Sequence, residues 1–192
     1  FRIDMRHILG LTVEFWDFAA ELTDLAEIVL ATALERCTAE LCAQYGQPFL
    51  GNGQPCGVTI LALGKCGGRE LGFASDVELM FVYAGVGQTS GPNVISSSDF
   101  YEKLVQSVIT TVHARQEGIL QIDLQLRPYG KAGSMAVALE AFRRYYAPDG
   151  PAWAYERQAL VKLRPISGDA ALGAQLCALR DAYTYQAGPF DV

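Results

Sequence analysis

Residues 58–83, VTILALGKCGGRELGFASDVELMFVY, predict the core of the fold: a strand, a glycine-rich turn, a short helix and a second strand. The first run, residues 58–63, is short and rich in aliphatic and β-branched residues, and it stops at Gly64. Such a run is typical of a buried strand rather than of a helix. The second run, residues 76–83, is equally apolar but opens with two carboxylates.

The turn between the two runs has the composition of a phosphate-binding loop. Gly67 and Gly68 allow the backbone to approach a bulky anion, and Lys65 and Arg69 add positive charge. A helix that began just after these glycines would direct unpaired N–H groups at the anion. The alternative for the two cations, a surface ion pair with neighbouring acids, is about equally favoured.

The two carboxylates at the start of the second run, Asp76 and Glu78, predict a metal site. Side chains alternate along a strand, so both project from the same side, roughly 7 Å apart at 3.3 Å per residue. Like charges this close repel each other unless a cation lies between them. A hard divalent ion such as Mg²⁺, shared with substrate phosphates, is the natural occupant. A solvated strand face is the alternative for an isolated pair.

A third strand is predicted over residues 119–126, ILQIDLQL, with Asp123 on its polar face. If this strand lies beside the second one, its carboxylate converges with Asp76 and Glu78. The turn that follows delivers two further cations, Arg127 and Lys131. The combination of a glycine turn with three acids makes the metal-site interpretation much stronger than the first pair alone.

Composition limits the class of protein. The chain has 192 residues, of which 51% are hydrophobic and 19% charged, which suits one substantial core. A net charge of −6 disfavours binding to nucleic acid, which requires a basic face. Five cysteines without CxxC spacing predict neither a zinc site nor a disulfide framework, and with no membrane span they favour the cytoplasm. The abrupt ends suggest a piece of a longer polypeptide.

The remaining chain is predicted to be mostly helical. Residues 13–45 form a long amphipathic helix, or two with a break, ended by Gly46 and Pro48, and an irregular connection follows to residue 57. After a polar loop at 84–98, the spacing of Ser96 and Asp99 predicts a capping box. Further elements are expected as helices at 100–115, 140–146, 153–163 and 169–185, and as a short strand at 134–139.

Four segments resemble one family closely. The glycine turn, the acid pair and the third acid resemble the signature of the nucleotidyltransferase superfamily related to DNA polymerase β. The segments GKCGGRELGFASDVELMFVY, DLQLRPYGKAG, LEAFRRYY and WAYERQALVKLRPISGD resemble, in order and spacing, motifs of the bacterial glutamine synthetase adenylyltransferases. The resemblance covers the chain from about Leu9 to its end. It implies an α+β fold, a small mixed sheet with helices, preceded and followed by further helices.

The resemblance also implies an activity. In this family one half of the enzyme attaches AMP from ATP to a tyrosine of glutamine synthetase, and the other half removes it by phosphorolysis, giving ADP. Which half this chain represents stays open. Glutamine synthetase is the implied protein substrate, and a PII-type signalling protein is a possible partner through regions outside this chain. The implied domains are a helical segment at 1–50 and a nucleotidyltransferase domain at 51–192, packed as one unit.

The site residues are implied by the same resemblance. The catalytic and metal-binding set, for two Mg²⁺ ions, is Asp76, Glu78 and Asp123. The residues implied to bind ATP or ADP are Lys65, Gly67, Gly68, Arg69, Ser75, Arg127 and Lys131.

Glu78 departs from the family pattern, which usually has aspartate at this position. The longer side chain moves the carboxylate by about one C–C bond and adds a rotor, which affects metal geometry. A catalytically weakened domain that binds nucleotide and regulates a neighbouring domain is therefore the alternative. A nucleotidyltransferase acting on RNA ends is disfavoured because the chain is acidic and has no basic, aromatic-rich segment.

Overall fold

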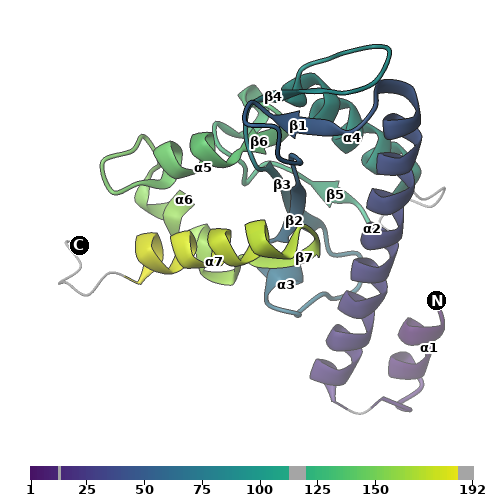
Figure 1. The fold of residues 1–192 in the computed structure, drawn as a ribbon. Helices are drawn as coiled ribbons and strands as arrows, with labels where there is room; N and C mark the ends of the chain where they lie inside the picture. The colour runs from purple at the N-terminus through teal and green to yellow at the C-terminus, as the bar shows by residue number, and fades with distance from the viewer. Residues whose placement is uncertain (13, 113–119, 186–192) are drawn as a thin grey trace.

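The computed structural model describes residues 1–12, 14–112 and 120–185, and its centre is a mixed sheet (Figure 1). The strand order is β5-β3-β2-β7, and β6 pairs with β3 beside this path. Strand β2 runs antiparallel to β3 and β7, whereas β3 runs parallel to β5 and β6. The bounds of these strands are β2 Val58–Ala62, β3 Val77–Tyr83, β5 Ile122–Asp123, β6 Ala136–Ala138 and β7 Arg164–Gly168.

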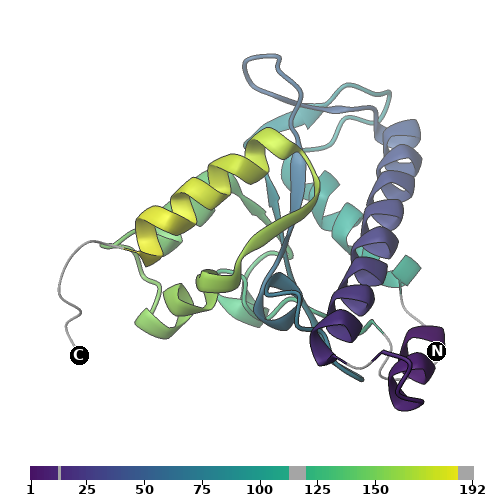
Figure 2. The same cartoon turned by 90° about the horizontal axis from the view of Figure 1, so that it is seen from below.

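Helices cover both faces of this sheet. Seen from below, α2 and α4 lie on one side of the strands and α5 and α7 on the other (Figure 2). The helices are α1 Arg2–Ile8, α2 Phe15–Tyr45, α3 Gly64–Gly67, α4 Ser97–Val112, α5 Leu139–Tyr146, α6 Ala154–Ala159 and α7 Ala170–Thr184, with 3₁₀ turns η1 Gly130–Ala132 and η2 Leu160–Lys162. No helix in the described ranges has the length and apolarity to cross a bilayer. The architecture confirms the predicted α+β class.

The two central strands are buried on both faces, as their sequence predicts. On β3, Leu79 and Phe81 join the cluster that includes Leu34 of α2 and Leu104 of α4. Met80, the residue between them, joins a second cluster formed with side chains of α5 and α7. Because side chains alternate along a strand, the apolar run 79–83 fills both layers at once.

Helix α2 is a single helix of 31 residues, which settles the question of a break. It ends at Gly46, as predicted, where φ is +78° and an added Cβ would lie 2.2 Å from the backbone nitrogen of Gly91. Phe18, Leu34 and Cys37 are buried, whereas Leu25 of the predicted stripe is largely exposed. The predicted first residue, Val13, lies outside the described residues.

Three sequence predictions of secondary structure were wrong. Residues 164–168, predicted as the connection between two helices, form β7, in which Pro165 is tolerated because β7 is an edge strand and its register with β2 shifts at Ile60/Leu61. The strand predicted at 119–126 is only β5, and Ile119 lies outside the described residues. The connections at 46–57 and 84–98 contain β1 Pro48–Leu50 and β4 Gly87–Thr89, which pair antiparallel.

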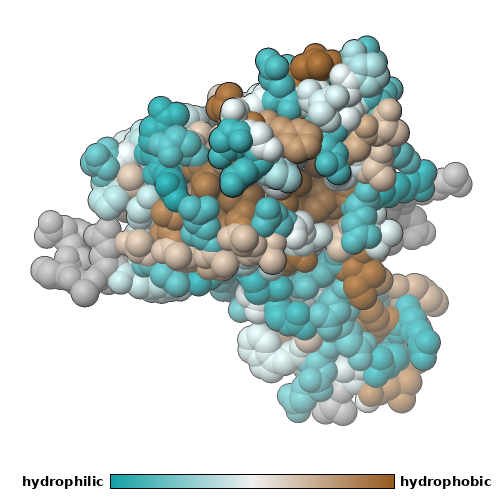
Figure 3. Space-filling view, in the orientation of Figure 1, coloured by the Kyte–Doolittle hydropathy of each residue, from teal (hydrophilic) through white to brown (hydrophobic). Residues whose placement is uncertain are grey.

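One face of the molecule combines an apolar centre with a hydrophilic surround. In the view of Figure 3, apolar side chains gather over the centre of the face, and hydrophilic ones surround them. A projection below the body carries α1 and the first turns of α2 (compare Figure 1), and its exposed apolar residues include Leu9 and Trp16.

Half of the capping box predicted at the start of α4 is present: Ser96 caps the helix with its side chain, but no bond from the Ser96 backbone N–H to Asp99 is found among the described residues. The backbone nitrogen of Asp99 donates to Ser96 Oγ at 3.0 Å, and Ser96 Oγ lies 2.7 Å from Asp99 Oδ2. These contacts satisfy groups that the first turn of a helix otherwise leaves without a partner.

We predict that Ser96→Ala lowers the free energy of unfolding by about 1 kcal/mol, because the cap is lost. Ser107→Ala, the same chemical change inside the same helix, should be neutral or slightly stabilising because alanine is the better helix former. Urea unfolding followed by circular dichroism measures both. Equal effects of the two substitutions would contradict a capping role for Ser96.

Candidate functional site

The site lies at the start of β3, where two of the predicted carboxylates stand side by side. Strand β5 runs parallel to β3, and Glu78 is in direct register with Asp123. Residues in register on neighbouring strands project from the same face, so the two side chains share one side of the sheet. The third strand therefore does lie beside the second, which was the condition set for the acids to converge.

Glu78 occupies an unusual environment for a carboxylate. Its backbone oxygen accepts a hydrogen bond from the nitrogen of Leu63 at 2.9 Å, which joins β3 to the end of β2. Its side-chain atom Oε2 is buried and has no hydrogen-bond partner among the described residues. A buried carboxylate oxygen without a donor is costly, so a cation at this position would stabilise it.

Asp123 and Asp76 flank Glu78 in different ways. Asp123 Oδ1 accepts from the backbone nitrogen of Gln125 at 2.8 Å, and this local turn fixes the orientation of the carboxylate. Asp76 is exposed and precedes the first residue of β3. The next residue, Val77, donates its N–H to the oxygen of Gln121 at 2.8 Å and so extends the β3–β5 pairing beside Asp76.

These carboxylates fit a Mg²⁺ ion that is shared with a substrate. Among residues 1–12, 14–112 and 120–185, no three His, Cys, Asp or Glu side chains form a group able to hold a metal. Mg²⁺ usually keeps several waters and is bound by one or two carboxylates together with substrate phosphates. The unsatisfied oxygen of Glu78 and the adjacent Asp123 supply that minimum with hard oxygen donors.

The glycine turn differs from the predicted phosphate loop in its local structure. Helix α3 begins at Gly64 and contains the glycine-rich stretch, whereas a helix after the glycines was predicted. The N–H groups of Gly67 and Gly68 already donate to the oxygens of Leu63 and Gly64, at 2.8 and 3.1 Å. These two amides are therefore engaged within the turn.

Gly67 serves the packing of the turn. An added Cβ would lie 2.0 Å from the carbonyl oxygen of Lys162, so only glycine allows this backbone approach. Gly68 is half-buried, and an added Cβ there would lie 2.8 Å from Glu70 Oε1. After the turn, Ser75 Oγ accepts from the nitrogen of Gly72 at 3.1 Å and closes the loop that leads to Asp76.

Ion pairs hold the turn against its neighbours. Arg69 contacts Asp24 of α2 at 2.7 Å. Of the two roles that the sequence left open for Arg69, phosphate binding and a surface ion pair, the structure shows the ion pair. Lys162 contacts Glu70 at 2.6 Å. Lys65 is exposed and pairs with no carboxylate in the described part of the chain.

Arg164 is the main anchor of the turn. Its side chain donates to the carbonyl oxygens of Cys66 and Gly67, both at 3.0 Å, and to Glu27 of α2 at 2.6 Å. One guanidinium thus satisfies the free carbonyls of α3 and ties α3 to α2 and β7. Burial raises the pKa of the neighbouring Cys66 thiol to about 12, so it remains protonated and inert near neutral pH.

Arg127 and Lys131 have different environments although both follow β5. Arg127 is only 8% exposed, and it donates to the carbonyl oxygens of Leu124, Gly133 and Ser134. Its guanidinium therefore organises the loop that contains Lys131. Lys131 is exposed in η1 and pairs with no carboxylate among the residues described.

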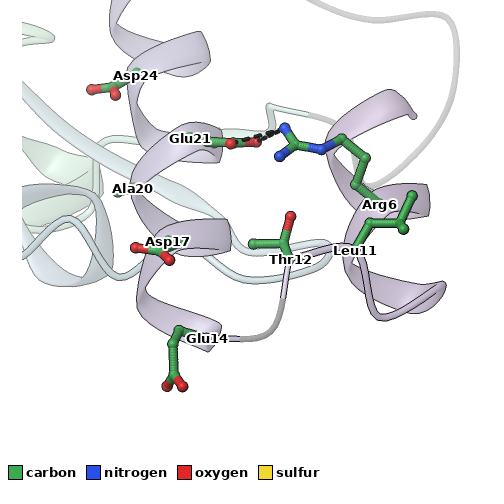
Figure 4. Close-up of a pocket in the computed structure, with 8 residues that line it drawn as sticks. All are labelled: Arg6, Leu11, Thr12, Glu14, Asp17, Ala20, Glu21 and Asp24. Atoms are coloured by element: carbon green, nitrogen blue, oxygen red, sulfur yellow. Dashed lines mark hydrogen bonds and ion pairs between the residues drawn. The ribbon is translucent and has the colours of Figure 1, made fainter.

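A hollow of about 480 Å³ lies between α1 and α2 (Figure 4), and one of its lining residues, Asp24, is the ion-pair partner of Arg69. The Arg6–Glu21 ion pair spans it at 2.9 Å. Its other charged lining residues are Glu14, Asp17 and Asp24. The excess of carboxylates would repel the phosphates of a nucleotide, so the hollow does not compete with the β3 site for that ligand.

Comparison with known proteins identifies the family of this chain. The family model described as Glutamate-ammonia ligase adenylyltransferase matches residues 1–178. The chain belongs to this family. The resemblance found in the motifs is thereby confirmed.

Relatives named bifunctional glutamine synthetase adenylyltransferase/adenylyl-removing enzyme include that of Thioalkalivibrio sulfidiphilus, 37% identical over 81% of this chain and 16% of the relative. The protein of Methylococcus capsulatus is 38% identical over 86% of this chain and 17% of its own length. That of Pseudomonas putida is 33% identical over 90% and 18%. This member of the adenylyltransferase family thus spans less than a fifth of the length of these relatives.

Sequence reasoning missed the contact between two residues that support the glycine turn of the candidate site. Glu27 lies in the middle of α2 and Arg164 lies in β7, 137 residues apart, and their ion pair exists only because both elements pack on the turn. Nothing in the local sequence indicates that the side chain of Arg164 faces the turn. Their contact is a tertiary property.

We predict that Arg127→Lys lowers the free energy of unfolding by about 1.5–3 kcal/mol, because the ammonium group of lysine cannot replace a guanidinium that donates to several carbonyl oxygens at once. Arg144→Lys is the matched control: Arg144 is 76% exposed, so the change should stay within about 0.5 kcal/mol. Thermal and urea unfolding measure both. Similar stabilities for the two variants would show that the bonds of Arg127 do not organise the loop.

Proposed function

We propose that this chain is a Mg²⁺-dependent nucleotidyltransferase domain that transfers AMP to, or removes it by phosphorolysis from, a tyrosine of glutamine synthetase. The observation that carries the proposal is the register of Glu78 with Asp123, together with the buried, unpartnered Oε2 of Glu78. Membership of the adenylyltransferase family supports the reaction class. The names of the relatives include both directions, adenylyl transfer and adenylyl removal.

The carboxylates would hold the ion and the reacting groups in line. Asp76, Glu78 and Asp123 present hard oxygens at the start of β3 and at β5. When bound there, Mg²⁺ would stabilise the negative charge that develops on the transferring phosphoryl oxygens. Lys65 and Lys131, both exposed, are the cations available to meet the phosphates of ATP or ADP.

Asp123 is the proposed general base. In the adenylylating direction it accepts the proton of the tyrosine hydroxyl, whose oxygen forms a bond to the α-phosphorus of ATP while the bond to pyrophosphate breaks. In the removing direction an oxygen of inorganic phosphate attacks the same phosphorus. Asp123 accepts the proton of the attacking phosphate and passes it to the tyrosine oxygen, whose bond to phosphorus breaks, and the product is ADP. The backbone bond from Gln125 keeps the carboxylate oriented for either transfer.

Glutamine synthetase is the proposed protein substrate, and the reaction would regulate nitrogen assimilation in the cytoplasm. A PII-type signalling protein would act through regions outside this chain. Nucleic acid is a poor candidate because the chain carries a net charge of −6.

We predict that Asp76→Asn and Asp123→Asn each reduce metal-dependent AMP transfer or phosphorolysis about 10²–10⁴-fold. Each variant removes a charge that the ion or the proton transfer requires. Radiolabelled AMP on glutamine synthetase measures the reaction in both directions. Asp149→Asn, the same change on an exposed loop, is the control and should retain turnover. Undiminished turnover in either site variant would overturn the proposal.

A weakened nucleotide-binding domain is the second candidate, and the absence of a ready three-acid cluster in the described residues favours it. We predict that Glu78→Asp gives no gain in turnover, because Glu78 already stands beside Asp123. A large gain would instead support the weakened domain. Isothermal titration with ATP and ADP, with and without Mg²⁺, supplies the independent measurement: a domain without the site should show no metal-dependent binding.

A further inference from the structure

Gly64 lies directly against the carboxylate of Glu78. It is the first residue of α3, just after β2, and its φ is +49°. A Cβ built at this position would lie 2.5 Å from Oε2, 2.6 Å from Cδ and 2.7 Å from Oε1 of Glu78. All three atoms of the carboxylate are closer than carbon contacts allow, so the side chain of Glu78 occupies the space that the missing side chain leaves.

This contact explains how the carboxylate of Glu78 is held. No donor in the described residues binds its Oε2 atom, so hydrogen bonding does not fix that oxygen. The backbone bond from Leu63 to Glu78 keeps the ends of β2 and β3 together, and it places Gly64 under the side chain. On the other side, β5 brings Asp123 into register. The position of the carboxylate is therefore set by shape, between a glycine and a second acid.

We propose that Gly64 is a positioning residue for Glu78: the absent side chain at position 64 allows a glutamate at position 78 to carry its carboxylate beside Asp123. The inference rests on the proposed function for the role of Glu78 and deepens it. Glutamate is longer than aspartate by one C–C bond, about 1.5 Å, and the niche over Gly64 accommodates that extra length. Positions 64 and 78 are thus coupled, and the residue at one limits the choice at the other.

The alternative is that Gly64 serves only its backbone conformation. A positive φ favours glycine wherever it occurs, and any substitution there is strained. Gly53 offers the matched control, because its φ is +81° and nothing lies within 4 Å of an added Cβ. Gly53→Ala therefore reports backbone strain without a contact to an acid.

The experiment combines Gly64→Ala with Glu78→Asp in the 192-residue chain. Mn²⁺ serves as the probe, and its affinity is measured by titration calorimetry and by its electron paramagnetic resonance signal. We expect Gly64→Ala to weaken Mn²⁺ binding about 10–100-fold, and Gly53→Ala to leave it unchanged. In the double variant the shortened acid withdraws from the new Cβ, so the affinity should return to that of Glu78→Asp alone. Wild-type affinity in Gly64→Ala would overturn the inference.

Thermal unfolding without metal is the second readout. We expect Gly64→Ala to lower Tm more than Gly53→Ala does, and to lower it less in the Glu78→Asp background than in the wild-type background. An equal loss in both backgrounds would show that Gly64 serves only its backbone. If Gly64→Ala does not fold, the double variant Gly64→Ala/Glu78→Ala is tested, because it removes the carboxylate that the new Cβ would meet. Folding of the double variant supports the inference. If the double variant also does not fold, the inference is overturned.

The two proposals fail differently. Loss of the coupling between positions 64 and 78, with metal-dependent turnover intact, removes the positioning role and leaves the proposed function standing. A wild-type chain that binds neither Mn²⁺ nor nucleotide removes the proposed function. The unfolding comparison then still decides whether Gly64 positions Glu78.

Discussion

The antiparallel pairing of β2 with β3 is the constraint on which the rest of the structure depends. Five residue pairs join these strands, from Val58↔Tyr83 to Ala62↔Leu79. Because helices cover both faces of the pair, every side chain from Leu79 to Tyr83 must be apolar or find a partner. Charge is tolerated only where the helical cover ends. That place is the start of β3, and both acids of the second run lie there.

The turn after β2 is stabilised from outside by charged side chains. Glycine at position 67 allows the backbone of Lys162 to approach, and Arg164 bonds to the carbonyls at the end of α3. Glu27 of α2 completes this arrangement. The basic and acidic residues around the turn thus stabilise the structure, whereas Lys65 and Lys131 are exposed and form no ion pair within the described residues. The site is assembled from two helices, α2 and α3, from strands β3, β5 and β7, and from the loops beside them, which are distant in sequence.

Much of the fold was predictable from local patterns. The apolar runs of β2 and β3, the long stripe of α2 and the side-chain cap that Ser96 gives α4 all rest on interactions between near neighbours, which the sequence displays directly. Strand β7 was not predictable in the same way, because Pro165 reads as the end of an element and is acceptable only on an edge with a register shift. β1 and β4 have only three residues each, too few to show a strand pattern, and their pairing depends on the close approach of Gly87 to Phe49.

The sequence by itself determined the family, the alternation that buries β3 on both faces, and the candidate acids Asp76, Glu78 and Asp123. Only the tertiary structure decided which groups are near one another. It placed Glu78 in register with Asp123, directed Arg69 to Asp24 and buried Arg127 among carbonyls. The physical reason is that residue type reports what a side chain can bind, whereas its actual partner is set by strand register and packing across long separations. The space over Gly64, which shapes the position of Glu78, arises only from that packing.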